Sequence, residues 1–118
     1  MERSIIFYKT AEGKSPVEEF LDSLPGKVVQ KVTWVLDLIR ETEKVPTIYL
    51  KKLHGSDDIW ECRIQFGSNI YRLFCFFDIG RVIVLTHGIV KKSQKTPKKE
   101  IKIAETYKND YFRRKQNG

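Results

Sequence analysis

The fold is decided by a stretch with the pattern of a β-hairpin, IWECRIQFGSNIYRLFCFF at residues 59–77. Two strand-like runs, 59–66 and 69–77, are rich in β-branched and aromatic residues. They are separated by Gly67-Ser68, and Gly-X is a favoured two-residue hairpin loop. A loop of this length fixes the register of the two strands, and with it the face on which each side chain lies.

The two faces of this hairpin differ in chemistry. One face is almost wholly apolar and is expected to contact the core; it carries Trp60, Cys62, Ile64, Phe66, Tyr71, Leu73, Cys75 and Phe77. The other face, which we expect to point away from that core, carries Glu61, Arg63, Gln65 and Arg72. Arg63 lies directly opposite Arg72, a repulsive arrangement that costs roughly 0.2–1 kcal/mol. The fold does not need this pair, whereas two guanidinium groups suit a phosphate; alternatively, Glu61 neutralises them in a solvated surface network.

The segments around the hairpin predict an α+β fold. Ser15, Pro16 and Glu18 form the N-terminal signature of a first helix. The expected order is a strand at 3–8, helices starting at 16 and 28, a loop at 47–58, strands at 59–66, 69–77 and 81–90, and a helix after 97. The order β-α-α-β-β-β-α indicates one domain over 1–118. In it, two N-terminal helices pack on one face of a small antiparallel sheet, and a basic helix ends the chain.

Charge is distributed unevenly along the chain. Residues 1–90 hold 12 Lys/Arg and 12 Asp/Glu, so the net charge of +7 lies in residues 91–118. A neutral body with a basic end suggests a polyanionic partner. With neither a membrane-spanning apolar run nor a signal peptide in the sequence, we expect a cytoplasmic protein. Cys62 and Cys75 are expected to be buried free thiols.

Further candidate residues flank the hairpin. The basic residues expected to contact nucleic acid are Lys51, Lys52, Lys91, Lys95, Lys98 and Lys99. His87, near the end of the last strand, is either a proton donor or acceptor or a structural residue, and His54 is expected to be exposed. The sequence has no nucleotide-binding glycine motif and no metal motif, so we expect no metal and no cofactor. RNA cleavage without a metal is chemically reasonable because the 2′-hydroxyl can attack the adjacent phosphate.

Four runs of sequence together resemble a known family. They are YLKKLHG at 49–55, IWECRI at 59–64, YRLF at 71–74 and HGIVKKSQKTP at 87–97. These runs resemble the RelE/ParE toxin superfamily, in particular its phage-derived, HigB-like branch. The resemblance implies a toxin of a type II toxin–antitoxin system, a ribosome-dependent mRNA endoribonuclease that inhibits translation. It also implies a helix-turn-helix, HigA-like antitoxin as partner, with mRNA and the ribosome as targets.

The resemblance assigns roles to residues of the site. Arg63 and Arg72 match positions that hold and polarise the scissile phosphate, and Lys91 or Lys92 matches a basic residue that follows the last strand. Relatives of the RelE type have a lysine where this chain has Glu61, and a tyrosine soon after the basic pair that is missing here. The general acid and base are therefore sought among Glu61, His87 and Lys92.

Two other functions fit parts of the same sequence. ParE-like toxins of the same superfamily poison gyrase without cutting RNA, and such a toxin would not need the cluster of Arg63, Arg72 and Lys92. A non-catalytic RNA- or protein-binding module of prophage origin would need only the basic C-terminal end. The cationic hairpin favours the nuclease over both alternatives.

Overall fold

The computed structural model describes residues 2–91 and 95–117 and confirms the α+β class. Within these residues the elements are β1 (Ser4–Phe7), α1 (Pro16–Asp22), α2 (Gly26–Glu41), β2 (Leu50–Lys52), β3 (Trp60–Phe66), β4 (Asn69–Asp78), β5 (Val82–Lys91) and α3 (Lys98–Asn117). The Ser15 hydroxyl accepts a hydrogen bond from the backbone N–H of Glu18, 3.2 Å away, and so caps α1 as expected. None of these helices has both the length and the apolar character needed to cross a membrane.

The five strands form one sheet in the order β1-β5-β4-β3-β2. β1 runs parallel to β5, whereas the other neighbouring strands are antiparallel, so the sheet is mixed and the expectation of a purely antiparallel sheet needs this correction. β2 lies inside the stretch that was expected to be a loop, at 47–58. It is a three-residue edge strand with two lysines, and short, lysine-bearing edges are a usual protection against edge-to-edge pairing.

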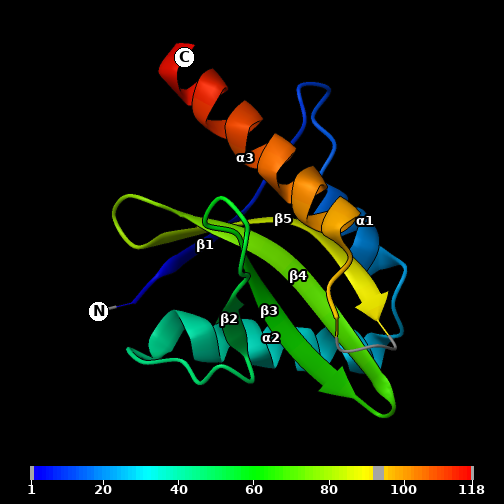
Figure 1. Cartoon of the computed structure of the whole chain (residues 1–118). Helices are drawn as coiled ribbons and strands as arrows, with labels where there is room; N and C mark the ends of the chain where they lie inside the picture. Colours follow the sequence, from blue (N-terminus) through cyan, green and yellow to red (C-terminus); the bar gives the residue numbers. More distant parts are fainter. Residues whose placement is uncertain (1, 92–94, 118) are drawn as a thin grey trace.

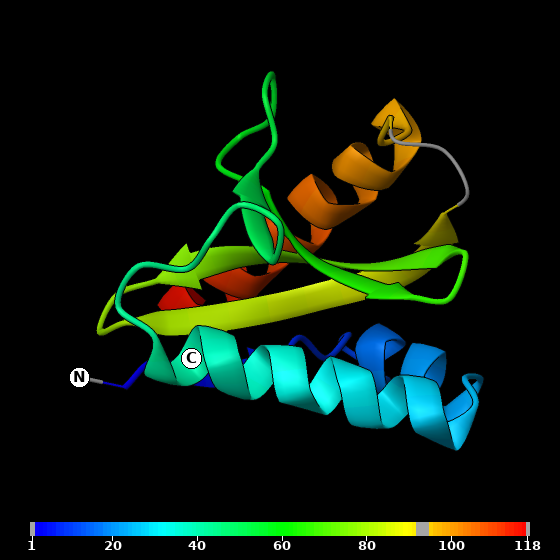
Figure 2. The same cartoon turned by 90° about the horizontal axis from the view of Figure 1, so that it is seen from below.

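The sheet lies between two helical layers. Figure 2 shows α1 and α2 on one side of the sheet and α3 on the other, and Figure 1 shows α3 crossing the strands obliquely. The first core, which faces α1 and α2, includes most of the apolar side of the hairpin as expected, with Cys62, Ile64, Tyr71, Leu73 and Cys75. Phe66 and Phe77, near the ends of β3 and β4, were expected in this core but are exposed. A second core, which faces α3, contains Tyr8, Leu53, Ile59, Phe74, Phe76, Val84 and Ala104.

The two cysteines are free, as expected. Both are fully buried in the first core, with their sulfur atoms 4.0 Å apart. They therefore behave as small apolar side chains in this packing.

A β-bulge in β5 sets which residues face α3. Phe74 pairs with His87, but Cys75 pairs with Leu85, so Thr86 is the additional residue. The Thr86 hydroxyl donates a hydrogen bond to the Phe74 carbonyl oxygen, 3.2 Å away. Because a bulge shifts the alternation of a strand by one residue, both Val84 and His87 can face α3.

Candidate functional site

The hairpin has the register that its sequence predicts. Arg63 pairs with Arg72, Glu61 pairs with Phe74, and on the other side of β3 Lys51 pairs with Glu61. Side chains at paired positions lie on the same face of a sheet. Charged residues from β2, β3 and β4 are therefore gathered on the face that α3 crosses.

Glu61 is the centre of a buried ion-pair network. Its Oε1 atom lies 2.8 Å from Nη1 of Arg72 and 3.5 Å from Nε of Arg63. The Thr96 hydroxyl donates to Oε2 of Glu61 at 3.1 Å and accepts from Nη1 of Arg72, also at 3.1 Å. Thr96 thus ties the segment before α3 to the hairpin.

Burial in this network excludes the alternative of a solvated surface network for two of its members. Glu61 and Arg72 are each only 1 % exposed, whereas the side chain of Arg63 is 25 % exposed. The face points away from the first core as expected, but Glu61 and Arg72 are not solvated on it, because Thr96 and α3 lie over them. Only Arg63 keeps substantial access to solvent among these three.

Lys91 adds a third positive charge on the same face of the sheet. It is the last residue of β5 and is 5 % exposed. Its Nζ atom has no hydrogen-bond partner among residues 2–91 and 95–117. Burial lowers the pKa of the Lys91 ammonium, the charges of Arg72 and Arg63 add to the lowering, and Glu61 opposes it. A buried ammonium without a partner is unfavourable, so this arrangement is suited to an incoming anion.

A hollow of about 350 Å³ opens over this network. It is lined by Lys51, Lys52, Leu53, His54, Glu61, Arg63, Arg72, Lys95, Thr96 and Ile101. Six of the residues predicted from sequence therefore come together here, whereas His87, Lys98 and Lys99 are not part of the lining. Lys92 lies outside the described residues. We call this hollow, together with Lys91, the cationic site.

Two polar residues of the cationic site, Thr96 and His54, were not singled out as functional from the sequence. Thr96 directly precedes the proline before the last helix, and a Thr-Pro pair gives no signal of a contact with Glu61, 35 positions away. His54 was expected to be merely exposed; it is exposed, but it lies at the wall of the cationic site. Its position next to the basic pair Lys51-Lys52 is the one sequence signal that could have placed it there.

His87 is held in a different environment. It is 8 % exposed, and its ring stacks on Phe74 with centroids 4.8 Å apart. Its Nδ1 atom lies 3.1 Å from the Thr86 hydroxyl, and its Nε2 atom lies 3.1 Å from Oε1 of Glu100 in α3. Burial lowers the pKa of His87, and the Glu100 carboxylate only partly offsets this. The ring therefore connects β5 to the first turn of α3.

The basic surface continues from the cationic site onto α3. Lys98 and Lys99 are exposed in the first turn of that helix. Lys98 lines a neighbouring hollow of about 320 Å³, to which His54 and Lys102 also contribute. Lys52 is held by Asp58, with Nζ and Oδ1 2.9 Å apart. Of the remaining described RNA-binding candidates, Lys51 pairs with Glu61 on the strand and Lys95 lines the cationic site.

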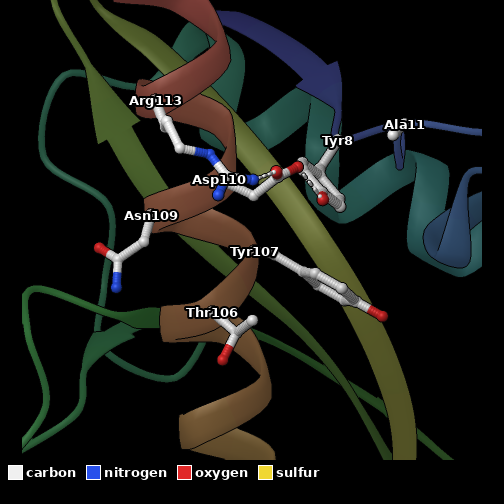
Figure 3. A pocket seen from close by; sticks show the side chains of 7 residues that line it. All are labelled: Tyr8, Ala11, Thr106, Tyr107, Asn109, Asp110 and Arg113. Carbon is white, nitrogen blue, oxygen red and sulfur yellow. Dashed lines mark hydrogen bonds and ion pairs between the residues drawn. The ribbon is translucent and has the colours of Figure 1, made fainter.

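A separate hollow of about 420 Å³ lies between the end of β1 and the C-terminal half of α3. Figure 3 shows Tyr8 and Asp110 pointing toward one another in it; the Tyr8 hydroxyl donates to Oδ2 of Asp110 at 2.5 Å. Tyr8 also stacks on Tyr107, with centroids 4.6 Å apart. Burial and the Asp110 carboxylate raise the pKa of Tyr8 to about 12. None of the residues predicted for the site lines this hollow. The contacts of Tyr8 with Asp110 and Tyr107 hold α3 against the sheet.

The chemistry available at the cationic site is anion binding with charge stabilisation. Two planar guanidinium groups and one ammonium lie around a single carboxylate, so positive charge remains in excess. Guanidinium forks match the oxygen atoms of phosphate in pairs. Among residues 2–91 and 95–117 there is no group of three or more His, Cys, Asp or Glu side chains that could hold a metal ion.

Comparison with known proteins gives the class of the chain. Residues 19–109 match the family described as phage-derived protein Gp49-like (DUF891). A chain in the crystal structure of the archaeal RelE–RelB complex from Pyrococcus horikoshii OT3 matches with a TM-score of 0.50 and 20 % sequence identity. That match covers 80 % of this chain and 100 % of the other. A search of curated proteins gave no match.

The chain therefore belongs to the phage-derived Gp49-like family. The match extends from α1 through most of α3, so it includes every described residue of the cationic site. The fold shared with the archaeal complex agrees with this assignment, and the resemblance to the RelE superfamily of toxins is confirmed.

Proposed function

We propose that this protein is the toxin of a type II toxin–antitoxin system and that it cleaves mRNA on the ribosome without a metal cofactor. One observation carries the proposal: two arginines and a buried lysine, whose Nζ has no hydrogen-bond partner among the described residues, lie together at a hollow lined by further lysines. A fold alone does not require this concentration of like charge. A site that binds a phosphate and stabilises its additional charge in the transition state does.

The proposed reaction is attack of a ribose 2′-hydroxyl on the adjacent phosphate. The O–P bond to the attacking oxygen forms, the bond to the 5′-oxygen of the next nucleotide breaks, and a proton passes from the first oxygen to the second. Arg63 is partly exposed and can contact the phosphate directly, while Arg72 and Lys91 supply positive charge from below. DNA lacks the internal nucleophile, so RNA is the expected substrate.

Proton transfer is assigned to groups at the wall of the site. Glu61 already accepts from Arg72 and Thr96, so its best role is to orient the guanidinium groups. His54 lines the site and carries an imidazole, the side chain that most readily exchanges protons near neutral pH. We assign general acid–base catalysis to His54 and keep Lys92 as the second candidate. His87 acts by positioning α3.

Binding to the ribosome is proposed to use the basic surface around the site. Lys51, Lys52, Lys95, Lys98 and Lys99 are all exposed on this side of the chain. Contacts of this kind with RNA phosphates release counterions, so affinity falls steeply with salt. Binding to 70S particles is therefore expected to weaken strongly between low and physiological salt.

The proposed partner is an antitoxin. The matched solved structure is a complex of RelE with RelB, and the HigB-like resemblance favours a helix-turn-helix, HigA-like protein for this chain. Charge complementarity would speed association with this basic domain. Both proteins are expected to act in the cytoplasm, where mRNA is translated.

The proposal is tested by inducing the chain in cells and following both transcripts and DNA. We expect translated mRNAs to be cut while DNA supercoiling stays unchanged. Intact transcripts with accumulating double-strand breaks would instead indicate a ParE-like gyrase poison. Binding of RNA without either effect would indicate a non-catalytic module.

A further inference from the structure

A second, smaller hollow adjoins the cationic site. Its volume is about 140 Å³, and it is lined by Ile48, Arg63, Gln65 and Ile70. Arg63 lines both hollows, so the two are adjacent. A ligand that contacts Arg63 in the cationic site therefore lies next to the smaller hollow. We call the smaller hollow the side slot.

The sheet explains why the side slot has a polar floor and apolar walls. Arg63 and Gln65 are two residues apart on β3, so both lie on the same face. Ile70 on β4 pairs directly with Gln65 and forms one wall. On the other side, the backbone N–H of Arg63 donates to the Tyr49 carbonyl oxygen at 2.8 Å, which places Ile48 beside Arg63 as the second wall.

The chemistry of these side chains suits one planar, partly polar ring. Ile48 is 63 % exposed although it is a large apolar residue. The slot has room for about four or five water molecules at ~30 Å³ each, which is too small for a folded peptide segment. The Gln65 amide offers a donor and an acceptor side by side, the pattern by which side-chain amides read base edges.

We propose that the side slot holds one unpaired base of the RNA strand, next to the phosphate bound at Arg63. The ring lies between Ile48 and Ile70, and the Gln65 amide reads its edge. Proteins recognise RNA sequence mainly through unpaired bases that are stacked and hydrogen-bonded in this way. The inference rests on the proposed nuclease function and extends it: Gln65 would give the enzyme a base preference at one position beside the cut.

The first test measures base preference. Wild type, Gln65→Ala and Gln65→Glu are assayed on ribosome-bound mRNAs that differ only in the nucleotides flanking the cut. Wild type should favour some bases over others at one position by about fivefold or more, and Gln65→Ala should reduce this spread to about twofold. Gln65→Glu, which can only accept, should shift the preference toward cytosine, whose amino group donates. Gln30→Ala, an exposed glutamine on α2, should keep the wild-type pattern.

The second test does not depend on cleavage. A short single-stranded RNA with one 2′-deoxy sugar at the scissile position cannot be cut, and a 2-aminopurine beside that sugar reports stacking by its fluorescence. Ile48→Ala should weaken RNA binding about fivefold or more, and it should abolish the change in 2-aminopurine fluorescence that the wild type causes on binding. Ile79→Ala is the matched control, because Ile79 is 81 % exposed and lies outside both hollows.

The outcomes separate the two proposals. If wild type cuts mRNA but the Gln65 and Ile48 variants keep its base preference and RNA affinity, the side slot does not hold a base and only this inference is overturned. If the Ile48 variant loses antitoxin binding while its RNA behaviour is unchanged, the slot is a protein contact and the inference is again overturned. If wild type neither cuts nor binds RNA, the proposed function fails and takes the inference with it.

Discussion

Replacing Lys91 with methionine should make the protein more stable and less active. The Lys91 ammonium is 5 % exposed and has no hydrogen-bond partner among the described residues. Leaving such a group unsatisfied costs about 1–3 kcal/mol, and attraction to Glu61 returns part of this. Methionine has similar length and no charge. We therefore expect Lys91→Met to raise the free energy of unfolding by about 1 kcal/mol, which corresponds to roughly 4 °C in melting temperature for a chain of this size.

The pH dependence gives this prediction a definite sign. Because the pKa of Lys91 is lowered from its ordinary 10.5, the unfolded chain binds more protons than the folded chain between the lowered value and 10.5. The stability contributed at this site therefore rises with pH in that window, and the advantage of methionine should shrink as pH approaches 10.5. Urea unfolding at several pH values measures this directly.

The control and the activity assay complete the test. Lys27 is exposed on α2, so Lys27→Met should change stability by no more than about 0.5 kcal/mol. Cleavage by Lys91→Met should fall on the order of a hundredfold, as when a transition-state charge stabiliser is removed. If Lys91→Met instead destabilises the protein by more than about 1 kcal/mol, the ammonium has a favourable partner in the folded state and the reasoning is refuted.

Three further predictions concern the surrounding structure. Arg72→Ala should destabilise by about 3 kcal/mol, because it leaves the buried Glu61 carboxylate without its best partner. His87→Gln should flatten the loss of stability on acidification below pH 6.5: the lowered pKa of His87 means that the unfolded state binds more protons there, so wild-type stability falls as pH falls. Gly88→Ala should destabilise by about 1–3 kcal/mol, since its Cβ would clash with the ring of Phe20.

Each of these has an outcome that would contradict it. Arg63→Ala should cost less than about 1 kcal/mol, because Arg63 is partly exposed, yet it should impair cleavage; equal stability loss in both arginine variants would contradict the burial argument. A wild-type acid slope of stability in His87→Gln would show that another group titrates. Gly67→Ala tests backbone strain without a steric clash, since Gly67 has a φ of 61° with open space around it. Wild-type stability for Gly88→Ala would mean that Phe20 moves freely.

Much of the hairpin could be predicted because strand alternation and turn chemistry are local. Gly67-Ser68 and the period of two fixed the register from Phe66 opposite Asn69 to Arg63 opposite Arg72, and the structure has those pairs. The apolar face and its contact with the N-terminal helices follow from the same alternation. These features need no knowledge of distant parts of the chain.

The burial of Glu61 and Arg72 could not be predicted in this way. It depends on where α3 crosses the sheet, and that position is fixed by long-range contacts such as Tyr8 with Asp110 and His87 with Glu100. The sequence did contain one signal of this burial, because Phe74 is a large apolar residue on the same face as Glu61 and Arg72. The bulge at Thr86, the parallel pairing of β1 and the short strand β2 are likewise products of tertiary packing that leave weak local patterns.

The central claim is tested most directly by primer extension on purified components. Ribosomes carrying one defined mRNA are incubated with wild type, with Arg63→Ala or with Lys91→Met, and the 5′ ends of the products are mapped. The account predicts cleavage within the codon exposed in the ribosome by wild type, and cleavage slower by on the order of a hundredfold in both folded variants. Intact mRNA with wild type, or wild-type rates in both variants, would contradict it.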